Sequence, residues 1–400
     1  MSASDRPDES RRPFILILSH LYPRDDAPVA GLFVQRYAHA LSRSADVSVV
    51  SVLPRSAGAR ASNRFATTEC DGVRTYLLER AAPEVRGCLG GYRWLWWATA
   101  GAVLAEMRGV LLAVRERGIP AVVNPHFTYP SGITASLLRL LGWRYVITEH
   151  STEFTKASGA FGQRGRLIRW LMRQALRKAA RVTVVSRALE QAMRSHGLKF
   201  ESEIVPNIID PPVLPEGEPG RRMVSVSLMN DRAKNISGLL RAIAELRERH
   251  GGLGLDLIGD GPDRSELERL SARLGLESIV TFHGLKSGAS TLESIAQSAF
   301  LVTNSNFETF SVVTAEAIAC GRPVVATRCG GPEEFVTPEA GVLIDPGNHD
   351  QLVGALEYML DHYEEYDRRA LQEYAKSLFS SEVVADRMMG AFRQSGALRR

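Results

Sequence analysis

The sequence predicts an α/β protein built from two doubly wound domains. Short apolar runs alternate with stretches of helical periodicity along nearly the whole chain, which is typical of parallel sheets covered by helices on both faces. The alternation is interrupted by a Pro- and Gly-rich stretch, 210–220, and begins again after it. A length of 400 residues also suffices for two domains with separate cores. We therefore expect two Rossmann-like domains that face each other across a cleft.

In the first domain, uninterrupted apolar runs predict buried strands, and apolar residues repeating every three to four positions predict helices. The predicted strands are 14–19, 47–53, 75–78, 121–124, 145–148, 182–185 and 203–205. The predicted helices are 32–42, 95–117, 133–141, 164–180 and 188–196. The polar start of the chain, 1–12, is expected to be disordered, so that the first domain spans 13–206.

The same patterns continue in the second domain, for which we expect the limits 207–380. The predicted strands are 223–228, 255–258, 279–282, 299–303 and 323–327. The predicted helices are 236–250, 264–274 and 312–320, and the pattern from 350 onward is helical throughout. The last helix lies within 381–400, and we expect it to pack back on the first domain.

Composition narrows the class of protein. A net charge of +4 is small for this length and gives no support for nucleic-acid binding. The four cysteines lack a CxxC spacing, which favours reduced thiols over a zinc site or a disulfide framework. The polar N-terminus and the short apolar run 14–18 do not resemble a signal peptide, and no run is long enough for a membrane span. We expect a cytoplasmic protein.

The stretch 304–334 connects one predicted strand to the next through a polar turn and an apolar helix. Ser311 stands where a helix N-cap is expected, and Glu316 lies inside the apolar helix. A carboxylate in such a helix is rarely buried without a partner. Glu308, eight residues earlier, lies in the preceding loop and can face the same pocket.

Two interpretations of Glu308 and Glu316 remain open. Both can be ordinary surface carboxylates. Alternatively, the helix that begins at Val312 directs its free N–H groups and the positive end of its dipole at an anion, and the two carboxylates bind uncharged hydroxyls beside it. The sugar hydroxyls of a nucleoside-diphosphate sugar fit this second description.

A loop that joins a strand to a helix carries Arg232 and Lys234. Cations in such loops are commonly solvated, but at the mouth of a cleft these two side chains can neutralise a departing diphosphate. In a second such loop, Gly259 opens the sequence GDGPD, which has Arg264 where a dinucleotide-binding fingerprint needs glycine. The turn therefore predicts close approach of a ligand to backbone, not a nicotinamide cofactor.

His150 and His126 each end a predicted strand, where side chains of a parallel sheet face the cleft. A structural role for a lone histidine is the commoner alternative. The chain contains neither a phosphate-binding P-loop sequence nor an Asp-x-Asp pair that would hold a metal. We therefore expect neither an essential metal nor another cofactor.

The predicted helix within 164–181 carries six arginines and one lysine interleaved with apolar residues. Arg166, Arg169, Arg173 and Arg177 recur at three- and four-residue steps and form one basic stripe. A solvated helix face is the common explanation. The functional alternative is that the stripe contacts an anionic membrane surface or a lipid-phosphate acceptor.

Taken together, these motifs resemble those of the family 4 retaining glycosyltransferases. The sequence from Glu308 to Glu316, continued as AIACGRPVVATRCGGPEE, is similar to the E-x7-E region of that family. Further similarities are Lys234-Asn235, 257–262, 280–284 and 205–207, and, more weakly, 30–33 and 148–150 in the first domain. The resemblance covers nearly the whole chain.

The resemblance implies the GT-B architecture and metal-independent transfer of a sugar from a nucleoside diphosphate to a hydroxyl acceptor. The implied catalytic residues are Glu308, Lys234 and His150. The implied donor-binding residues are Arg232, Lys234, Gly259, Glu308, Thr309, Phe310, Ser311, Val312 and Glu316. The implied acceptor-side residues are Gly31, His126 and His150. The family often has Arg near the position of Leu228, so that Arg232 is expected to replace it as a phosphate ligand.

Two alternatives remain for the function. One is a nucleotide-sugar epimerase of the same two-domain architecture, and the other is a catalytically inert nucleotide-sugar-binding protein. The combination of Glu308, Glu316 and Lys234 argues against an inert protein. Product analysis without an acceptor would separate the transferase from the epimerase.

Overall fold

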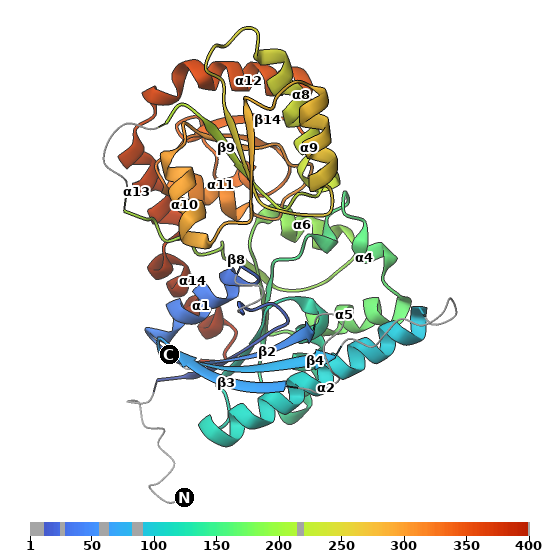
Figure 1. Cartoon of the computed structure of the whole chain (residues 1–400). Helices are drawn as coiled ribbons and strands as arrows, with labels where there is room; N and C mark the ends of the chain where they lie inside the picture. Colours follow the sequence, from blue (N-terminus) through green and yellow to red (C-terminus); the bar gives the residue numbers. More distant parts are fainter. Residues whose placement is uncertain (1–11, 25–28, 56–63, 82–90, 214–219, 399–400) are drawn as a thin grey trace, which may run out of the picture.

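The computed structural model describes residues 12–24, 29–55, 64–81, 91–213 and 220–398. The expected disordered segment 1–12 lies outside these residues except for Arg12. Figure 1 shows two lobes, one above the other, with the first strands in the lower lobe and the strands from β9 onward in the upper lobe. We refer to them as the N-terminal and C-terminal domains.

The N-terminal domain contains one mostly parallel sheet. Its strands are β1 (Phe14–Ser19), β2 (Asp46–Arg55), β3 (Arg64–Cys70), β4 (Val73–Ala81), β5 (Val122–Pro125), β6 (Val146–Glu149), β7 (Arg181–Val184) and β8 (Ser202–Ile204). Two bridges join β5 to β6 and so connect the order β3-β4-β2-β1-β5 to β6-β7-β8. Only β3 runs antiparallel among the strands described.

Helices cover both faces of this sheet. They are α1 (Leu32–Ser42), α2 (Gly91–Arg117), α3 (Ile133–Leu138), α4 (Ala160–Gln163), α5 (Arg166–Lys178) and α6 (Arg187–Ser195). Helices α2, α3 and α5 share one core with Leu16 and Leu18, whereas α1 packs with Ile15 and Ile17 on the opposite face. This alternation of inward-facing residues is that of a strand buried on both faces.

The C-terminal domain is a six-stranded parallel sheet in the order β11-β10-β9-β12-β13-β14. Its strands are β9 (Met223–Val226), β10 (Leu255–Ile258), β11 (Val280–Gly284), β12 (Leu301–Thr303), β13 (Val324–Thr327) and β14 (Gly341–Ile344). Its helices are α7 (Asp231–Lys234), α8 (Ile236–Leu246), α9 (Arg264–Arg273), α10 (Gly288–Gln297), α11 (Val312–Ala319), α12 (His349–His362) and α13 (Arg368–Phe379). This order places a topological switch point between β9 and β12, where doubly wound folds bind ligands.

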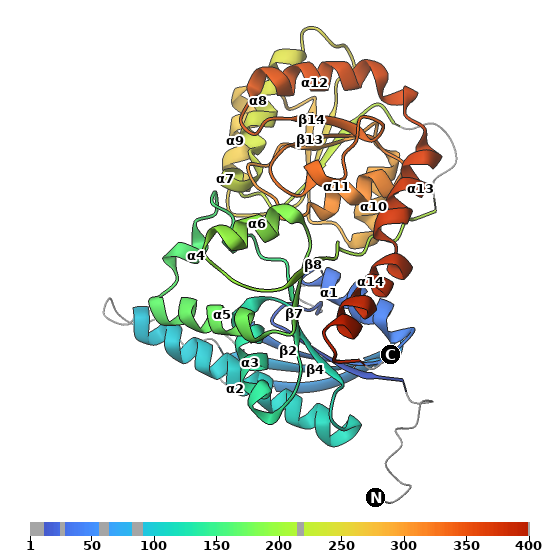
Figure 2. The same ribbon diagram turned by 180° about the vertical axis from the view of Figure 1, so that it is seen from behind.

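The last helix, α14 (Ser381–Gln394), returns to the N-terminal domain as expected. It lies beside α1 in the lower lobe in both views (Figures 1 and 2). Its fully buried Phe392 and Met388 join the core of Ile15 and Val49. The carboxylate of Asp210 accepts a 2.9 Å hydrogen bond from the Ser381 backbone N–H and fixes the start of the helix.

Five of these strands and helices were not predicted, namely the strands β3 and β14 and the helices α4, α7 and α10. Strand β3 carries polar, exposed residues at the edge of the sheet, so it has no apolar run by which to detect it. None of the described helices is long and apolar enough to cross a bilayer.

Candidate active site

The site begins at the switch point of the C-terminal sheet. Lys234 lies on the short helix after β9, and Glu308 lies in the loop after β12. Because these two strands are neighbours, the carboxyl ends bring the side chains together, and Lys234 Nζ lies 2.5 Å from Glu308 Oε1. Ser305 Oγ donates a 2.9 Å hydrogen bond to the same oxygen. The Glu308 carboxylate is therefore fixed in position, and its charge is balanced by Lys234.

The glycine turn after β13 supports the loop that carries Glu308. Gly330 has a φ of 125°, and a Cβ atom there would lie 2.5 Å from the Glu308 carbonyl oxygen. A Cβ atom on Gly331 would lie 2.3 Å from Phe310 Cα. The two glycines thus allow close backbone packing beneath the predicted donor loop.

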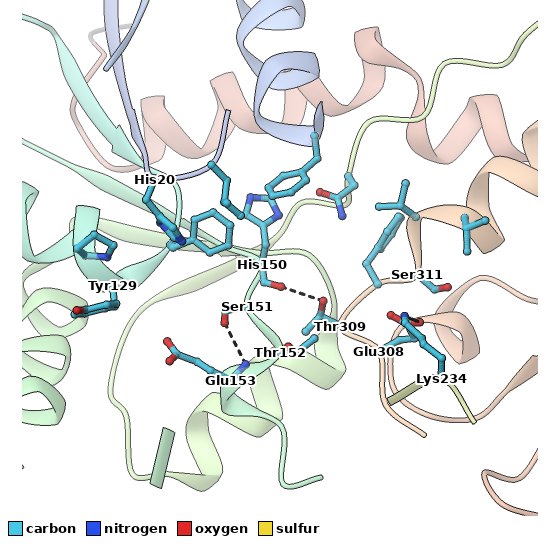
Figure 3. A pocket seen from close by; sticks show the side chains of 18 of the residues that line it. His20, Tyr129, His150, Ser151, Thr152, Glu153, Lys234, Glu308, Thr309 and Ser311 are labelled. Carbon is cyan, nitrogen blue, oxygen red and sulfur yellow. Dashed lines mark hydrogen bonds and ion pairs between the residues drawn. The ribbon is translucent and has the colours of Figure 1, made fainter. Parts of the chain in front are cut away.

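A central pocket of about 610 Å³ opens between the two domains (Figure 3). From the C-terminal domain it is lined by Lys234 and by the continuous segment 308–313. From the N-terminal domain it is lined by His20, Leu21, Phe33, Phe127, Tyr129, Pro130, 150–153, Arg164 and Asn207. The pocket thus contains His150, Lys234, Glu308, Thr309, Phe310, Ser311 and Val312 from the sequence-predicted set.

The start of α11 forms one wall of this pocket. Ser311 occupies the predicted N-cap position, but its φ is 69° and its side chain caps no backbone N–H. Instead its hydroxyl shares a 2.8 Å hydrogen bond with Thr314 Oγ1. The first N–H groups of a helix have no acceptor within the helix, and here the Ser311 side chain does not cap them either. They lie beside the pocket. This arrangement suits an anion.

His150 and His126 stack against each other, with 3.0 Å between His126 Nδ1 and His150 Nε2. Burial lowers the pKa of His150 to about 3 and that of His126 well below its ordinary value. Both rings are therefore neutral at neutral pH. His150 lines the central pocket, but His126 lies behind it and does not, which corrects the predicted contact of His126 with an acceptor.

Glu149, just before His150, is a fully buried residue that the sequence analysis missed. Its carboxylate accepts four hydrogen bonds, from the N–H and hydroxyl of Thr128 and from the N–H groups of His150 and Ser151. Burial raises its pKa to about 7, although the hydrogen bonds act in the opposite direction. Glu149 therefore joins the loops after β5 and β6. A carboxylate inside an apolar strand was the signal that could have revealed it.

The N-terminal wall carries a second ion pair. Arg164 Nε lies 2.5 Å from Glu153 Oε2, and its guanidinium lies 4.1 Å from the centre of the Tyr129 ring. Arg164 was predicted to begin the basic helix, but it precedes α5 and lines the central pocket. Tyr129 and Glu153 carried no sequence signal because they lie in short irregular segments.

A side pocket of about 400 Å³ adjoins the central pocket, and Phe33 and Val312 line both. Glu316 and Gly259 line this side pocket. The sequence predicted that Glu308 and Glu316 can face the same pocket, but they face two neighbouring pockets. Helix α11 separates them, because its start faces one pocket and its second turn faces the other.

The partner of Glu316 comes from the other domain. Arg36 on α1 places a guanidinium nitrogen 2.9 Å from Glu316 Oε1 and donates a 3.2 Å hydrogen bond to the Ile208 carbonyl. Burial raises the pKa of Glu316, and Arg36 opposes that shift. The sequence predicted that a buried Glu316 needs a partner, but it did not identify Arg36.

Two residues of the predicted site line neither pocket, namely Arg232 and Gly31. Arg232 is exposed and donates a 3.2 Å hydrogen bond to the Ala157 carbonyl, away from Leu228, which lines the side pocket. Gly31 packs against Leu21, so closely that a Cβ atom would be 2.5 Å from the Leu21 carbonyl carbon, and Phe33 instead lines both pockets.

Across the described part of the chain, one group of three side chains could hold a metal ion, namely His39, Cys70 and Asp71. None of these residues lines the central or the side pocket.

Each of the two domains matches a protein-family model of glycosyltransferases. Residues 30–207 match the model described as a glycosyl transferase 4-like domain, and residues 210–378 match the model of glycosyl transferases group 1. The chain is 26% identical over 327 residues to an uncharacterised glycosyltransferase of Methanocaldococcus jannaschii, covering 74% of this chain and 83% of that protein. It is 32% identical over 171 residues to a lipopolysaccharide core biosynthesis glycosyltransferase of Rhizobium meliloti, covering 42% of this chain and 48% of that protein.

Solved structures share the fold. The sucrose-phosphate synthase of Thermosynechococcus elongatus superposes with a TM-score of 0.75 at 22% identity, covering 97% of this chain and all of that one. The structure of Anabaena HepE in complex with UDP-glucose gives a TM-score of 0.67 at 18% identity, covering 95% and 99% of the two chains. The protein is a member of the family 4 glycosyltransferases with the two-domain GT-B fold.

Proposed function

We propose that this glycosyltransferase transfers a sugar from a nucleoside-diphosphate sugar to a hydroxyl acceptor with retention of configuration. The observation that carries the proposal is the pair Lys234–Glu308 beside the free start of α11, at the junction of two pockets. The binding of UDP-glucose by the structurally similar HepE supports the donor class.

The two pockets suggest how a donor would lie. The nucleoside occupies the side pocket, where Glu316 binds ribose hydroxyls. The diphosphate lies where Phe33 and Val312 line both pockets, next to Lys234 and the start of α11. The sugar then lies in the central pocket, with Glu308 on one side and His150 on the other.

The state of the carboxylates bears on the route by which the configuration would be retained. Among the residues described, those lining the central pocket are Glu153 and Glu308, and each is tied into an ion pair. Neither is a free nucleophile, so we propose attack by the acceptor hydroxyl on the face that the diphosphate leaves. The departing phosphate takes the proton of that hydroxyl, while Lys234 and the N–H groups of α11 stabilise the charge on the diphosphate. In this scheme no residue holds an essential metal.

A thermal-shift screen tests the donor class. ADP-, GDP- and UDP-linked hexoses are added to the protein, and binding of one of them should stabilise it by about 2.7 kcal/mol at a hundredfold excess over its dissociation constant. The ligand that binds should then yield free nucleoside diphosphate when an acceptor is supplied. An epimerised donor, formed without acceptor, would instead support the epimerase alternative. Binding without either product would support the inert alternative.

The role of Glu316 has its own test. Glu316→Ala should weaken binding of the nucleoside diphosphate, because the ribose hydroxyls lose their carboxylate acceptor. Unchanged affinity in calorimetry would exclude this role.

We also propose peripheral contact with an anionic membrane through the outer surface of α2, α3 and α5, which lie together on one side of the N-terminal domain (Figure 2). Exposed apolar side chains gather there: Leu104, Leu111, Leu137, Leu140, Leu141, Leu167 and Trp170. The arginines of the predicted stripe lie among them, with Arg166, Arg173 and Arg177 exposed and Arg169 half-buried. Apolar side chains mixed with cations are typical of helices that lie on a membrane surface.

Vesicle pelleting tests this contact. The wild-type protein should sediment with phosphatidylglycerol-containing vesicles and remain in solution with phosphatidylcholine alone. Arg173→Glu/Arg177→Glu should abolish sedimentation, whereas Arg43→Glu/Lys199→Glu, which makes the same change of charge at exposed sites elsewhere, should not. Equal sedimentation of both double variants would disprove the contact, and a protein acting on a soluble acceptor would remain.

A further inference from the structure

The proposed position of the diphosphate has few cations beside it. Lys234 is bound to Glu308, and Leu228, at the end of β9 in the side pocket, is an exposed apolar residue. Lys286, also in the side pocket, donates a 2.8 Å hydrogen bond to Ser294 Oγ. A diphosphate is strongly anionic, so its burial between the domains requires further positive charge.

Arg36 supplies a further positive charge near the proposed position of the diphosphate. It lies on α1 one turn after Phe33, which lines both pockets at the expected position of the diphosphate. Its contacts with Glu316 and with the Ile208 carbonyl involve two of the five N–H donors of a guanidinium. Its side chain is 26% exposed, so it is open to the side pocket and only partly solvated.

The neighbouring Glu316 makes this cation more necessary. Without Arg36, a carboxylate that is largely buried would stand beside an incoming diphosphate and repel it. With Arg36 in place, Glu316 is neutralised and still has a second oxygen for a ribose hydroxyl. These two contacts leave three guanidinium N–H groups for a phosphate oxygen.

We propose that Arg36 is a diphosphate ligand that the N-terminal domain contributes to the donor site. This inference rests on the proposed function, and it means that the donor is bound by both domains together. Glu316 then has two roles, since it orients Arg36 and accepts hydrogen bonds from the ribose. A guanidinium is suited to this position because it can hold a carboxylate and a phosphate oxygen at the same time.

The alternative role for Arg36 is a simple connection between the domains. The two roles predict different effects of removing Arg36 on the affinity for ligands with and without phosphate. A diphosphate ligand contributes affinity only when phosphate is present. A connection that merely occupies Glu316 hinders every nucleoside ligand, so its removal should strengthen binding or leave it unchanged.

Calorimetry on Arg36→Gln distinguishes these roles. ADP, GDP and UDP are titrated into the wild-type protein, and the tightest of the three is then compared with its own nucleoside in each variant. Arg36→Gln should weaken binding of the diphosphate by about tenfold to a hundredfold, and binding of the nucleoside by less than about threefold. Arg36→Lys, which keeps the charge, should recover part of the loss and guards against misfolding of the glutamine variant.

Arg43→Gln is the matched control, because it removes an exposed arginine at the end of the same helix. It should bind the diphosphate as the wild type does. Equal losses for diphosphate and nucleoside in Arg36→Gln, or unchanged or tighter binding of the diphosphate, would overturn the role of Arg36. If none of the three diphosphates binds the wild-type protein, the proposed function itself fails before any variant is compared.

Discussion

At the residue scale, Lys234 and Glu308 form an ion pair in the wall of the central pocket, where we expect the donor to bind. The 2.5 Å contact places a cation in the wall of the central pocket and holds Glu308 in an ion pair, so that it is not a free nucleophile. A departing diphosphate would draw Lys234 toward itself as negative charge develops on the bridging oxygen. We therefore expect Lys234 to exchange part of its interaction with Glu308 for one with the departing diphosphate.

Replacing Lys234 tests this interpretation. Lys234→Ala should lower kcat by about a hundredfold or more, since removing one stabilising group from a developing charge has effects of that size. Lys199→Ala, at an exposed loop position, is the control and should leave kcat unchanged. Initial rates of transfer measure both, and a near-normal rate for Lys234→Ala would exclude the residue from leaving-group stabilisation.

Glu106 is a second buried carboxylate with a measurable consequence. It lies on α2, is fully buried, and accepts hydrogen bonds from Ser131 and Thr134 without an ion-pair partner in the described structure. Burial raises its pKa to about 7 from an ordinary 4.5. The folded state therefore binds its proton more tightly, and the resulting stabilisation is full below pH 4.5 and is lost as the pH rises through 7.

Glu106→Gln should remove this pH dependence, because the amide is neutral at every pH. Relative to the wild type, the variant should be more stable at pH 8 than at pH 5, with a change of about 1.4 kcal/mol for each unit of pKa shift. Urea midpoints at the two pH values measure it. The variant is compared with the wild type because the buried His126 and His150 have the opposite effect. Their lowered pKa values make the protein less stable as the pH falls below 6.5, in both proteins alike. Parallel curves for the two proteins would contradict the assignment.

At the element scale, α14 joins the end of the chain to its beginning. Phe392 and Met388 are fully buried in the same core as the first strand, so the N-terminal domain is completed by residues that follow the C-terminal domain in sequence. Phe392→Ala should lower the free energy of unfolding by about 3–5 kcal/mol through lost burial and a cavity.

Arg393→Ala provides the control, because this neighbouring side chain on the same helix is exposed. It should change stability by less than about 0.5 kcal/mol. Denaturant unfolding of both variants measures the difference, and equal stabilities would show that α14 does not contribute to the core.

At the scale of the whole molecule, hydrogen bonds join the two domains, among them those from Arg232 to the Ala157 carbonyl and from the Ala188 N–H to Glu334. Besides the Arg36–Glu316 pair, Thr309 Oγ1 donates a 3.0 Å hydrogen bond to the His150 carbonyl across the central pocket (Figure 3). Contacts of this kind align the loop that carries Glu308 with the opposite wall of the pocket. A small change in their number can alter how often the two domains are correctly opposed.

Thr309→Val keeps the shape of the side chain and removes this hydrogen bond. We expect it to lower kcat by about fivefold to tenfold, the value of one neutral hydrogen bond, with little change in the affinity for the nucleoside diphosphate. Thr68→Val, exposed on β3, is the control. Steady-state kinetics and calorimetry separate the two effects; a loss of nucleotide affinity equal to the loss of kcat would contradict a role in alignment.

The sequence by itself determined the two-domain α/β fold, the return of the last helix and the loops that carry Lys234, Glu308 and His150. These features follow from local hydrophobic periodicity and from the rule that parallel strands present their carboxyl ends at one edge. Even the need for a partner at Glu316 was evident, because an unpaired carboxylate is costly in an apolar helix.

Only the tertiary structure decided which side chains meet. It separated Glu308 from Glu316 into two pockets, chose Arg36 as the partner of Glu316, turned Arg232 toward Ala157 and placed His126 behind His150. These outcomes depend on how one domain faces the other and on which turn of a helix reaches the cleft. Neither is encoded in the spacing of residues along one segment, since the partners come from elements far apart in the chain.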